Sequence, residues 1–185
     1  MRVRSANRAD IPAMIELNNQ SATAARWSVQ QYESLFAQIS SAGVSPASAA
    51  ELDAQLSQRV ILVAEDVSEV PAAVAPGEHR ILAFLVARRV ADEWELENIV
   101  VAAGSRRRGI GRRLLEDLIK QARTKDVTSI FLEVRQSNLG ARAFYNKLGF
   151  VEFGSRKGYY SHPPEDAVLY RLSVSHNETA PQIWH

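Results

Sequence analysis

Residues 104–115 read GSRRRGIGRRLL and lead from an arginine-rich segment into a leucine-rich run. From here the apolar residues recur at the spacing of an amphipathic helix, and they are Ile110, Leu114, Leu115, Leu118, Ile119 and Ala122. No Ser, Thr, Asp or Asn stands directly before Ile110 to cap such a helix. We therefore predict a helix whose first backbone N–H groups, at the positive end of its dipole, can bind an anion.

The chemistry of this loop leaves two interpretations open. Gly109 and Gly111 allow the backbone to approach a ligand closely or to adopt a positive φ. The arginines around them add charge and paired donors suited to phosphate, and they are Arg106, Arg107, Arg108 and Arg112. The loop is predicted either to bind a polyanion such as a pyrophosphate or to be a solvated basic turn.

Neither of two familiar nucleotide-binding motifs is complete in this loop. A Walker A loop requires Lys-Ser/Thr after its last glycine, but Arg112 and Arg113 stand there. The dinucleotide fingerprint requires a third glycine where Leu114 stands, and its turn follows a strand directly, whereas AAGSRRR intervenes here. Glu133 lies near the place of that motif's acidic residue, so dinucleotide binding stays as a weaker alternative.

The composition argues against several other functions. The formal net charge is +1 and RRR lacks a nearby aromatic platform, so nucleic-acid binding is not expected. Without cysteine the chain can form no disulfide, cysteine metal site or thiol nucleophile. No G-x-S-x-G motif supplies a serine nucleophile. We expect no metal site, because the histidines lack ligand spacing; they are His79, His162, His176 and His185.

The rest of the sequence predicts one α/β domain with a mixed sheet over residues 1–175. Asp10 is expected to cap a helix after a short first strand. Ser28 and Gln31 have the spacing of a capping box that opens a second helix, with Trp27 as its staple residue. Further strands are predicted at 59–66, 81–90, 94–103, 127–134, 150–160 and 166–174, with a helix at 137–149 that ends at Gly149.

Three segments are predicted to lie outside this core. They are an extra helix or loop segment at about 40–58, a loop at about 68–80 and a flexible tail at 176–185. No apolar run reaches the roughly 18 residues of a membrane span, and the N-terminus lacks the apolar core of a signal peptide. A cytoplasmic protein with no membrane partner is expected.

The R-x-x-G-x-G pattern of residues 106–111 resembles the acyl-CoA pyrophosphate loop of the GNAT N-acetyltransferases. FLEVRQSNLGARAFYNKLGF, residues 131–150, resembles the strand, helix and turn that follow in this family. WELENIVV at 94–101 and RKGYYSHPPEDAVLYRL at 156–172 resemble neighbouring strands. RWSVQQYESLF at 26–36 is similar to the RimI-like subgroup, which acetylates the N-terminal alanine of a ribosomal protein.

The resemblance departs from the family at two places. Ala102, Ala103 and Gly104 replace a frequent Asp-Pro before the loop, and the segment at 40–58 has no counterpart. The first change removes no catalytic group, whereas the second puts the identity of the acceptor in doubt. The oligomeric state is not predicted.

This resemblance implies a single GNAT-fold domain. Its sheet would be mixed and mostly antiparallel, with flanking helices and a splayed parallel strand pair at the acetyl-CoA site. It implies direct transfer of acetyl from acetyl-CoA, without a metal, to the α-amino group of a protein or peptide, with a ribosomal protein as the candidate acceptor. A lysine or small-molecule amine is the alternative acceptor, and a non-catalytic acyl-CoA-binding or dinucleotide-binding module is the alternative of another class.

The resemblance also assigns two catalytic candidates. Glu133 is the expected general base, acting directly or through water, because its strand face with Phe131 would surround it with apolar neighbours and raise its pKa. The alternative is a carboxylate paired with Arg135 or another arginine. Tyr145 is the expected general acid for the CoA thiolate, and the alternative is a packing role.

Further residues are expected at the ligands. In the family, backbone groups beside a bulge contact the pantetheine and the acetyl carbonyl, here those of Ile99, Val100 and Val101. The pyrophosphate loop comprises Arg106, Arg107, Arg108, Gly109, Ile110, Gly111 and Arg112. Asn138 is expected to cap a helix, to contact the pantetheine, or both. Tyr159 and Tyr160 are acceptor-contacting candidates or an exposed aromatic pair, and Trp27 lines the acceptor groove or packs as a staple.

Overall fold

The computed structural model describes residues 1–21, 23–25, 27–40, 59–67 and 80–174. Its strands are β1 (Arg2–Ser5), β2 (Arg59–Glu65), β3 (Ile81–Val90), β4 (Glu93–Val101), β5 (Ser129–Arg135), β6 (Val151–Ser161) and β7 (Pro164–Ser173). Its helices are α1 (Ile11–Asn19), α2 (Val29–Ser40), α4 (Ile110–Thr124) and α5 (Leu139–Lys147), with short 3-10 turns η1 (Arg8–Asp10) and η2 (Ala103–Ser105). The segments expected at about 40–58, 68–80 and 176–185 lie outside the described residues, except for Ser40 and Arg80 at their borders.

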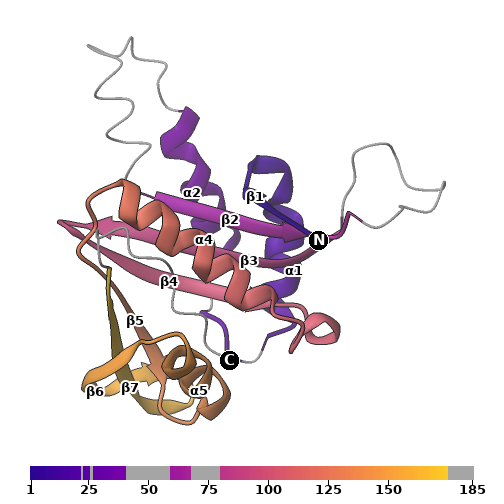
Figure 1. Cartoon of the computed structure of the whole chain (residues 1–185). Coiled ribbons are helices and arrows are strands. Elements are labelled where there is room, and N and C mark those ends of the chain that lie inside the picture. Colours follow the sequence, from indigo (N-terminus) through magenta and orange to yellow (C-terminus); the bar gives the residue numbers. More distant parts are fainter. Residues whose placement is uncertain (22, 26, 41–58, 68–79, 175–185) are drawn as a thin grey trace.

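The strands form a seven-stranded sheet in the order β1-β2-β3-β4-β5-β7-β6. Helix α4 covers one face, while α1 and α2 cover the other (Figure 1). Alternate residues of β2 enter opposite cores: Val60 and Leu62 lie in the core with α4, and Ile61 and Val63 lie in the core with α1 and α2. Burial on both faces explains why β2 and β3 are almost continuously apolar.

The centre of the sheet contains the parallel pair β4 and β5. Their ladder runs from Glu93 opposite Ser129 to Leu96 opposite Leu132 and stops there. At the same point β4 carries a bulge at Glu97, because Leu96 pairs with Ala87 and Asn98 pairs with Val86. Beyond the bulge β4 follows β3, and β5 follows β7. The expected mixed sheet with a splayed parallel pair is thus confirmed.

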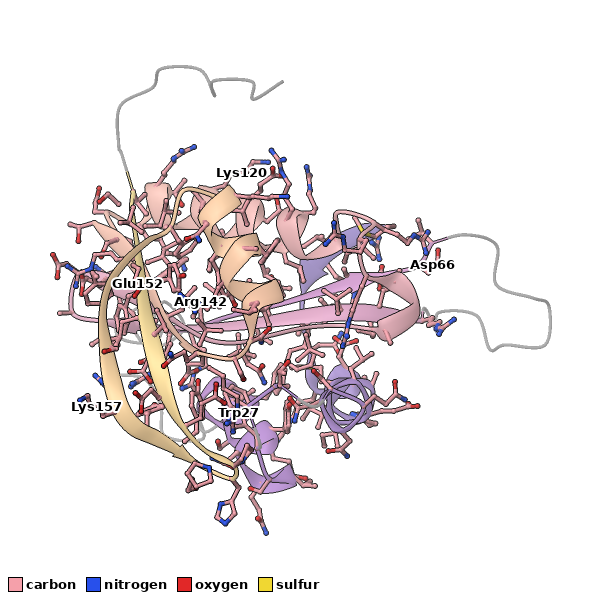
Figure 2. All side chains as sticks on the ribbon, turned by 90° about the horizontal axis from the view of Figure 1, so that it is seen from below. Trp27, Asp66, Lys120, Arg142, Glu152 and Lys157 are labelled. Carbon is pink, nitrogen blue, oxygen red and sulfur yellow. The ribbon has the colours of Figure 1, made fainter. Side chains whose placement is uncertain are left out.

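The start of α2 forms as its sequence predicts. The backbone N–H of Ser28 donates to Gln31 Oε1 at 2.7 Å, and the N–H of Gln31 donates to Ser28 Oγ at 3.3 Å. The ring of Trp27 packs edge-on against Tyr32, with 5.4 Å between centroids. These contacts are the reciprocal capping box and its hydrophobic staple. Trp27 lies on the side of the sheet that α1 and α2 occupy (Figure 2).

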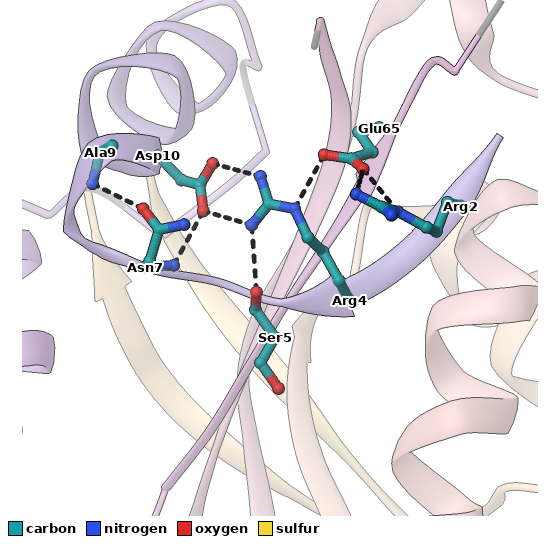
Figure 3. Close-up of polar contacts among 7 residues, drawn as sticks. All are labelled: Arg2, Arg4, Ser5, Asn7, Ala9, Asp10 and Glu65. Carbon is teal, nitrogen blue, oxygen red and sulfur yellow. Dashed lines mark hydrogen bonds and ion pairs between the residues drawn. The ribbon is translucent and has the colours of Figure 1, made fainter. Parts of the chain in front are cut away.

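The expectation that the Asp10 side chain caps helix α1 is wrong. Asp10 stands at the N-cap position of α1, but its carboxylate binds Arg4 at 2.7 and 2.8 Å and the backbone N–H of Asn7 at 2.8 Å. Arg4 also binds Glu65, which Arg2 contacts as well (Figure 3). The bond between Asp10 and Asn7 is local and belongs to the capping box that opens η1, whereas Glu65 joins the network only through the β1–β2 pairing. The network fastens the first strand and helix to the sheet.

This network changes the pKa values of the Asp10 and Glu65 carboxyls. Burial, the largest single influence, would raise the pKa of Asp10 and of Glu65. The hydrogen bonds and charge of Arg4, joined by the Asn7 N–H at Asp10 and by Arg2 at Glu65, together outweigh burial and lower both pKa values. Asp10 and Glu65 are therefore ionised near neutral pH. Elsewhere, Arg142 of α5 pairs with Glu152 of β6 at 3.3 Å, and both residues are labelled in Figure 2.

Candidate functional site

A cavity of about 940 Å³ opens where β4 and β5 part. Its walls come from the loop before α4, from α5, from the bulged half of β4 and from the end of β5. The loop between α1 and α2 and the end of β6 close the other side, through Ser21, Thr23, Ala24, Ala25, Tyr159, Tyr160, Ser161 and His162. This volume suits a small molecule or cofactor. We name the side near α4 and α5 the cofactor end and the side near the α1–α2 loop and β6 the acceptor end, after the roles that are proposed for them below.

The loop before α4 has the geometry of an anion-binding backbone. Gly109 occupies the N-cap position with φ +79°, and within the described residues no side chain caps this helix. Arg107 also has a positive φ, of 63°. Alternating left- and right-handed residues gather successive N–H groups on one side of a chain, as anion-binding nests do. The predicted uncapped helix is therefore confirmed.

Gly111 is the second residue of this helix and faces β4 and α5. A Cβ atom there would lie 3.4 Å from Phe144 and 3.5 Å from Val101, which is ordinary van der Waals contact. A methyl group at this position would therefore pack against both side chains without displacing them.

The arginines of the loop differ in whether they line the cavity and in which groups they contact. Arg106, Arg107 and Arg112 line the cavity, whereas Arg108 is not among the described residues that do. Arg106 donates from Nε to the carbonyl of Val101 at 3.2 Å, and Arg112 pairs with Glu116 at 2.8 Å. The guanidinium groups of Arg106 and Arg112 thus already make contacts within the protein.

Glu133 lies at the parting of the strands with its side chain 11% exposed. Ile130, Leu132 and Val134 are buried on the opposite face of β5, as predicted. The expectation of apolar neighbours for Glu133 is wrong, because its Oε1 pairs with Arg156 Nη1 at 2.8 Å and its carboxylate bonds to the Tyr159 hydroxyl. The alternative of an arginine partner therefore describes the geometry, although that arginine is Arg156.

Arg135, the other arginine considered for this pair, has different partners. It binds Glu165 at 3.1 Å and the carbonyls of His162 and Pro163. Arg156 and Tyr159 reach Glu133 from β6, which shifts register between Arg156 and Tyr160. Gly158, with φ +59°, lies within this shift, and a lone glycine inside a strand is the local signal of such an irregularity. The residue that the shift brings to Glu133 is not given by that signal.

Tyr145 both packs and reaches the cavity. Its buried ring contacts Phe144, Phe150 and Tyr170 at centroid distances of 5.4 to 6.2 Å. The residue also lines the cavity. Burial raises the pKa of the Tyr145 hydroxyl, so this group keeps its proton at neutral pH.

Asn138 stands beside the cofactor end, at the start of α5. Its Oδ1 accepts a hydrogen bond from the Ala141 N–H at 3.1 Å, so the expected N-cap is confirmed. Asn138 also lines the cavity, and this capping bond does not use its Nδ2 donors.

The two tyrosines of β6 form a polar and aromatic corner at the acceptor end. Tyr159 and Tyr160 pack edge-on at 5.0 Å, with Arg135 over Tyr160 at 4.1 Å and Arg156 over Tyr159 at 5.6 Å. The hydrogen bond with Glu133, together with burial, raises the pKa of Tyr159 to about 12, and burial raises that of Tyr160. Tyr159 is nevertheless 47% exposed, on an edge strand. Trp27 is not among the described residues lining the cavity and packs as the staple of α2.

The bulged part of β4 contributes residues that sequence analysis missed. Glu97 lines the cavity and pairs with Arg59 at 3.3 Å and Arg88 at 3.2 Å, while burial raises its pKa despite these arginines. Asn98 is buried beside it, and Ile99, Val100 and Val101 line the cavity as predicted. The consecutive polar residues Glu97 and Asn98 interrupt an otherwise alternating strand, which is the signal that could have revealed the bulge.

In the part of the chain that the structure describes, no three acidic or histidine side chains gather as a metal ion would require. In the same residues, no helix is both long and apolar enough to cross a membrane.

Known proteins are similar to this chain in sequence and in fold. The model of the acetyltransferase (GNAT) family matches residues 29–150. The ribosomal protein bS18-alanine N-acetyltransferase of Salmonella typhimurium strain LT2 is 43% identical over 100 residues, which make up 53% of this chain and 68% of that protein.

Solved structures extend the similarity to nearly the whole chain. The ribosomal-protein-S18-alanine N-acetyltransferase from Escherichia coli has a TM-score of 0.67 at 27% identity, covering 100% of this chain and 98% of that one. The NatC complex bound to Gag peptide and CoA has a TM-score of 0.69 at 15% identity over 94% of this chain and 98% of that one, a likeness of fold alone. Because the family model covers well over half of the sequence, this chain belongs to the GNAT family of acetyltransferases.

Proposed function

We propose that this protein transfers the acetyl group of acetyl-CoA to the α-amino group of a protein or peptide whose first residue is small. The observation that carries the proposal is a continuous cavity at the β4–β5 opening that is lined both by the α4 loop and by Glu133. The similarity to a ribosomal protein bS18-alanine N-acetyltransferase supports a ribosomal protein N-terminus as the acceptor.

The cofactor end fits the pyrophosphate and pantetheine of acetyl-CoA. The backbone N–H groups of residues 107–112 would hold the pyrophosphate at the uncapped end of α4, with the arginines in a secondary role. Asn138 and the backbone of Ile99, Val100 and Val101 would bind the pantetheine arm. The bulge at Glu97 changes the pairing of β4 with β3, and backbone N–H groups there can stabilise charge on the acetyl oxygen.

Glu133 is the proposed general base. An α-amino group has a pKa near 8, so only roughly a tenth is neutral at pH 7, and a positioned carboxylate that takes the proton, directly or through water, assists attack. Arg156 and Tyr159 hold the Glu133 carboxylate at the wall of the cavity. Attack forms the new C–N bond at the thioester carbon as the C–S bond breaks.

Tyr145 is the proposed general acid. The departing CoA thiolate needs a proton, and the Tyr145 hydroxyl carries one because burial raises its pKa. The thiolate would form beside the buried Tyr145, and burial there makes it a stronger base than in solution. One proton thus passes to Glu133 from the amine and one passes from Tyr145 to sulfur.

The acceptor end favours a main-chain amine with a small first side chain. Among the described residues of its α1–α2 wall, Ser21, Thr23, Ala24 and Ala25 line the cavity, and these four small residues leave room for a backbone and carry no charge. Tyr159 and Tyr160 stand on the β6 side, where aromatic rings and hydroxyls can contact a peptide backbone.

The test is mass spectrometry of a peptide library incubated with the protein and acetyl-CoA. Each sequence is supplied in two matched forms: a free N-terminus without lysine, and a blocked N-terminus with one internal lysine. We expect acetylation of free α-amino groups, strongest on peptides that begin with alanine or serine. Acetylation confined to lysine ε-amines, or to none of the peptides, would overturn the proposal.

A further inference from the structure

Two buried asparagines connect β4 with the loop between α1 and α2. Asn98 of β4 donates from Nδ2 to Oδ1 of Asn18 at 3.1 Å, and Asn18 donates from Nδ2 to the carbonyl of Ala25 at 2.9 Å. The side chains belong to residues 80 positions apart, and both residues are at least 94% buried. We call this chain of contacts, Asn98 to Asn18 to Ala25, the amide relay.

The two ends of the relay lie on different walls of the cavity. Asn98 follows the bulge residue Glu97, and Ala25 belongs to the small-residue wall of the acceptor end. Asn18 stands between them in the last turn of α1, where its own carbonyl also accepts the N–H of Ser21 at 3.0 Å. The relay therefore fixes the start and the end of the α1–α2 wall against the strand beside the reaction centre.

An amide side chain at position 18 can form two hydrogen bonds that an apolar side chain could not form. It accepts from Asn98 and donates to Ala25 at the same time, and burying it without such partners would be unfavourable. Its neighbours in the core include Met14 and Leu17, which an aliphatic side chain would join readily. Ala24 and Ala25 offer no polar side chain that could anchor the wall, so the backbone carbonyl is the group that Asn18 binds.

We propose that Asn18 and Asn98 are positioning residues for the acceptor. They set the distance between β4 and the α1–α2 wall, and hence the place of the incoming amine relative to the acetyl group. This inference rests on the proposed function. Because the α4 loop lies at the opposite end, loss of the relay affects acceptor binding and leaves acetyl-CoA binding intact.

The test compares Asn18→Ala, Asn98→Ala and the double variant with Asn19→Ala, a matched change at the exposed neighbour of Asn18. With a peptide that begins with alanine, each relay variant is expected to raise the acceptor KM by about three- to tenfold, as the loss of one net hydrogen bond implies. The KM for acetyl-CoA should stay within about twofold, and Asn19→Ala should match the wild type. The double variant should be no worse than the worse single variant, because either change already breaks the same relay.

Asn18→Asp provides a second variant of the same size. It still accepts from Asn98 but places an oxygen against the Ala25 carbonyl, so it should also raise the acceptor KM. Retained stabilisation by acetyl-CoA in thermal melting identifies the variants that fold. An unchanged acceptor KM in folded variants, or additive effects in the double variant, would overturn the relay.

Hydrogen–deuterium exchange separates this inference from the proposed function. Asn18→Ala and Asn98→Ala should speed amide exchange in the α1–α2 loop, while α4 and Asn19→Ala behave as the wild type does. If the wild type acetylates no amine, the proposed function fails, and unchanged loop exchange in the variants would then show that the relay fails as well.

Discussion

The two ends of the cavity are built in different ways. The cofactor end is formed largely by backbone from one short stretch, residues 105–112, together with the start of α5. The acceptor end is assembled from side chains far apart in the sequence, such as Glu133 with Arg156 and Asn18 with Asn98. A backbone site tolerates most side-chain changes but not a change in chain path, whereas a side-chain site can be retuned one residue at a time. We expect the cofactor end to define the family chemistry and the acceptor end to define the substrate.

The largest expected effect is that of Glu133→Gln. Loss of the general base should lower kcat by about 10²- to 10⁴-fold, with the affinity for acetyl-CoA unchanged because Glu133 lies away from the α4 loop. Steady-state kinetics and acetyl-CoA titration measure the two quantities. Glu152→Gln, a matched change on β6 at the pair with Arg142, should retain activity. Near wild-type turnover in Glu133→Gln would remove Glu133 from the mechanism.

Tyr145→Phe should have the next largest effect and should lower kcat about a hundredfold. The phenyl ring keeps the contacts with Phe144, Phe150 and Tyr170, so thermal stability should hardly change. Tyr170→Phe is the control, because Tyr170 is also a buried tyrosine but is not among the described residues lining the cavity. If the two variants have equal kcat, Tyr145 serves packing alone.

The cofactor end can be tested by comparing a glycine with an arginine. Gly109→Val forces a branched side chain into φ +79°, which costs about 1–3 kcal/mol and should weaken acetyl-CoA binding roughly tenfold or more. Arg107→Ala removes one exposed charge and should weaken binding about two- to threefold. Calorimetric titration of both variants gives the ranking, and the reverse order would mean that charge, rather than backbone, makes this site.

The smallest effect on acetylation is expected at the Arg2, Arg4, Asp10 and Glu65 network, which lies outside the cavity lining. The pKa values of Asp10 and Glu65 are lowered in the folded state, so their contribution to stability is present above the unfolded values near 4 and is lost as the pH falls through the folded values. Melting temperatures should fall steeply below about pH 4, and Glu65→Gln should make that fall shallower. An unchanged acid profile in the variant would contradict this role for the network.

The difference between the two ends also explains what the sequence could predict. The uncapped α4 helix, the α2 capping box and the N-cap at Asn138 depend on neighbours within a few residues, and each was foreseen. The pairing of Glu133 with Arg156 and the relay through Asn18 join residues from elements far apart in the sequence, so no local pattern gives these partners, although Gly158 and the Glu97–Asn98 pair mark the irregular places in β6 and β4. Asp10 differs, because its partners Arg4 and Asn7 lie within six residues, and the capping-box spacing of Asn7 and Asp10 was available in the sequence.

The most direct test of the account is a conjugate that joins CoA covalently to the α-amino group of an alanine-starting peptide. If the cavity is one site with a cofactor end and an acceptor end, this conjugate should bind at least about a hundredfold more tightly than CoA, because the second contact becomes intramolecular. It should protect the α4 loop, the α1–α2 loop and the end of β6 from hydrogen exchange. The same peptide joined through a lysine side chain should gain far less. Equal affinities for CoA and the α-linked conjugate, or protection of the α4 loop alone, would contradict the account.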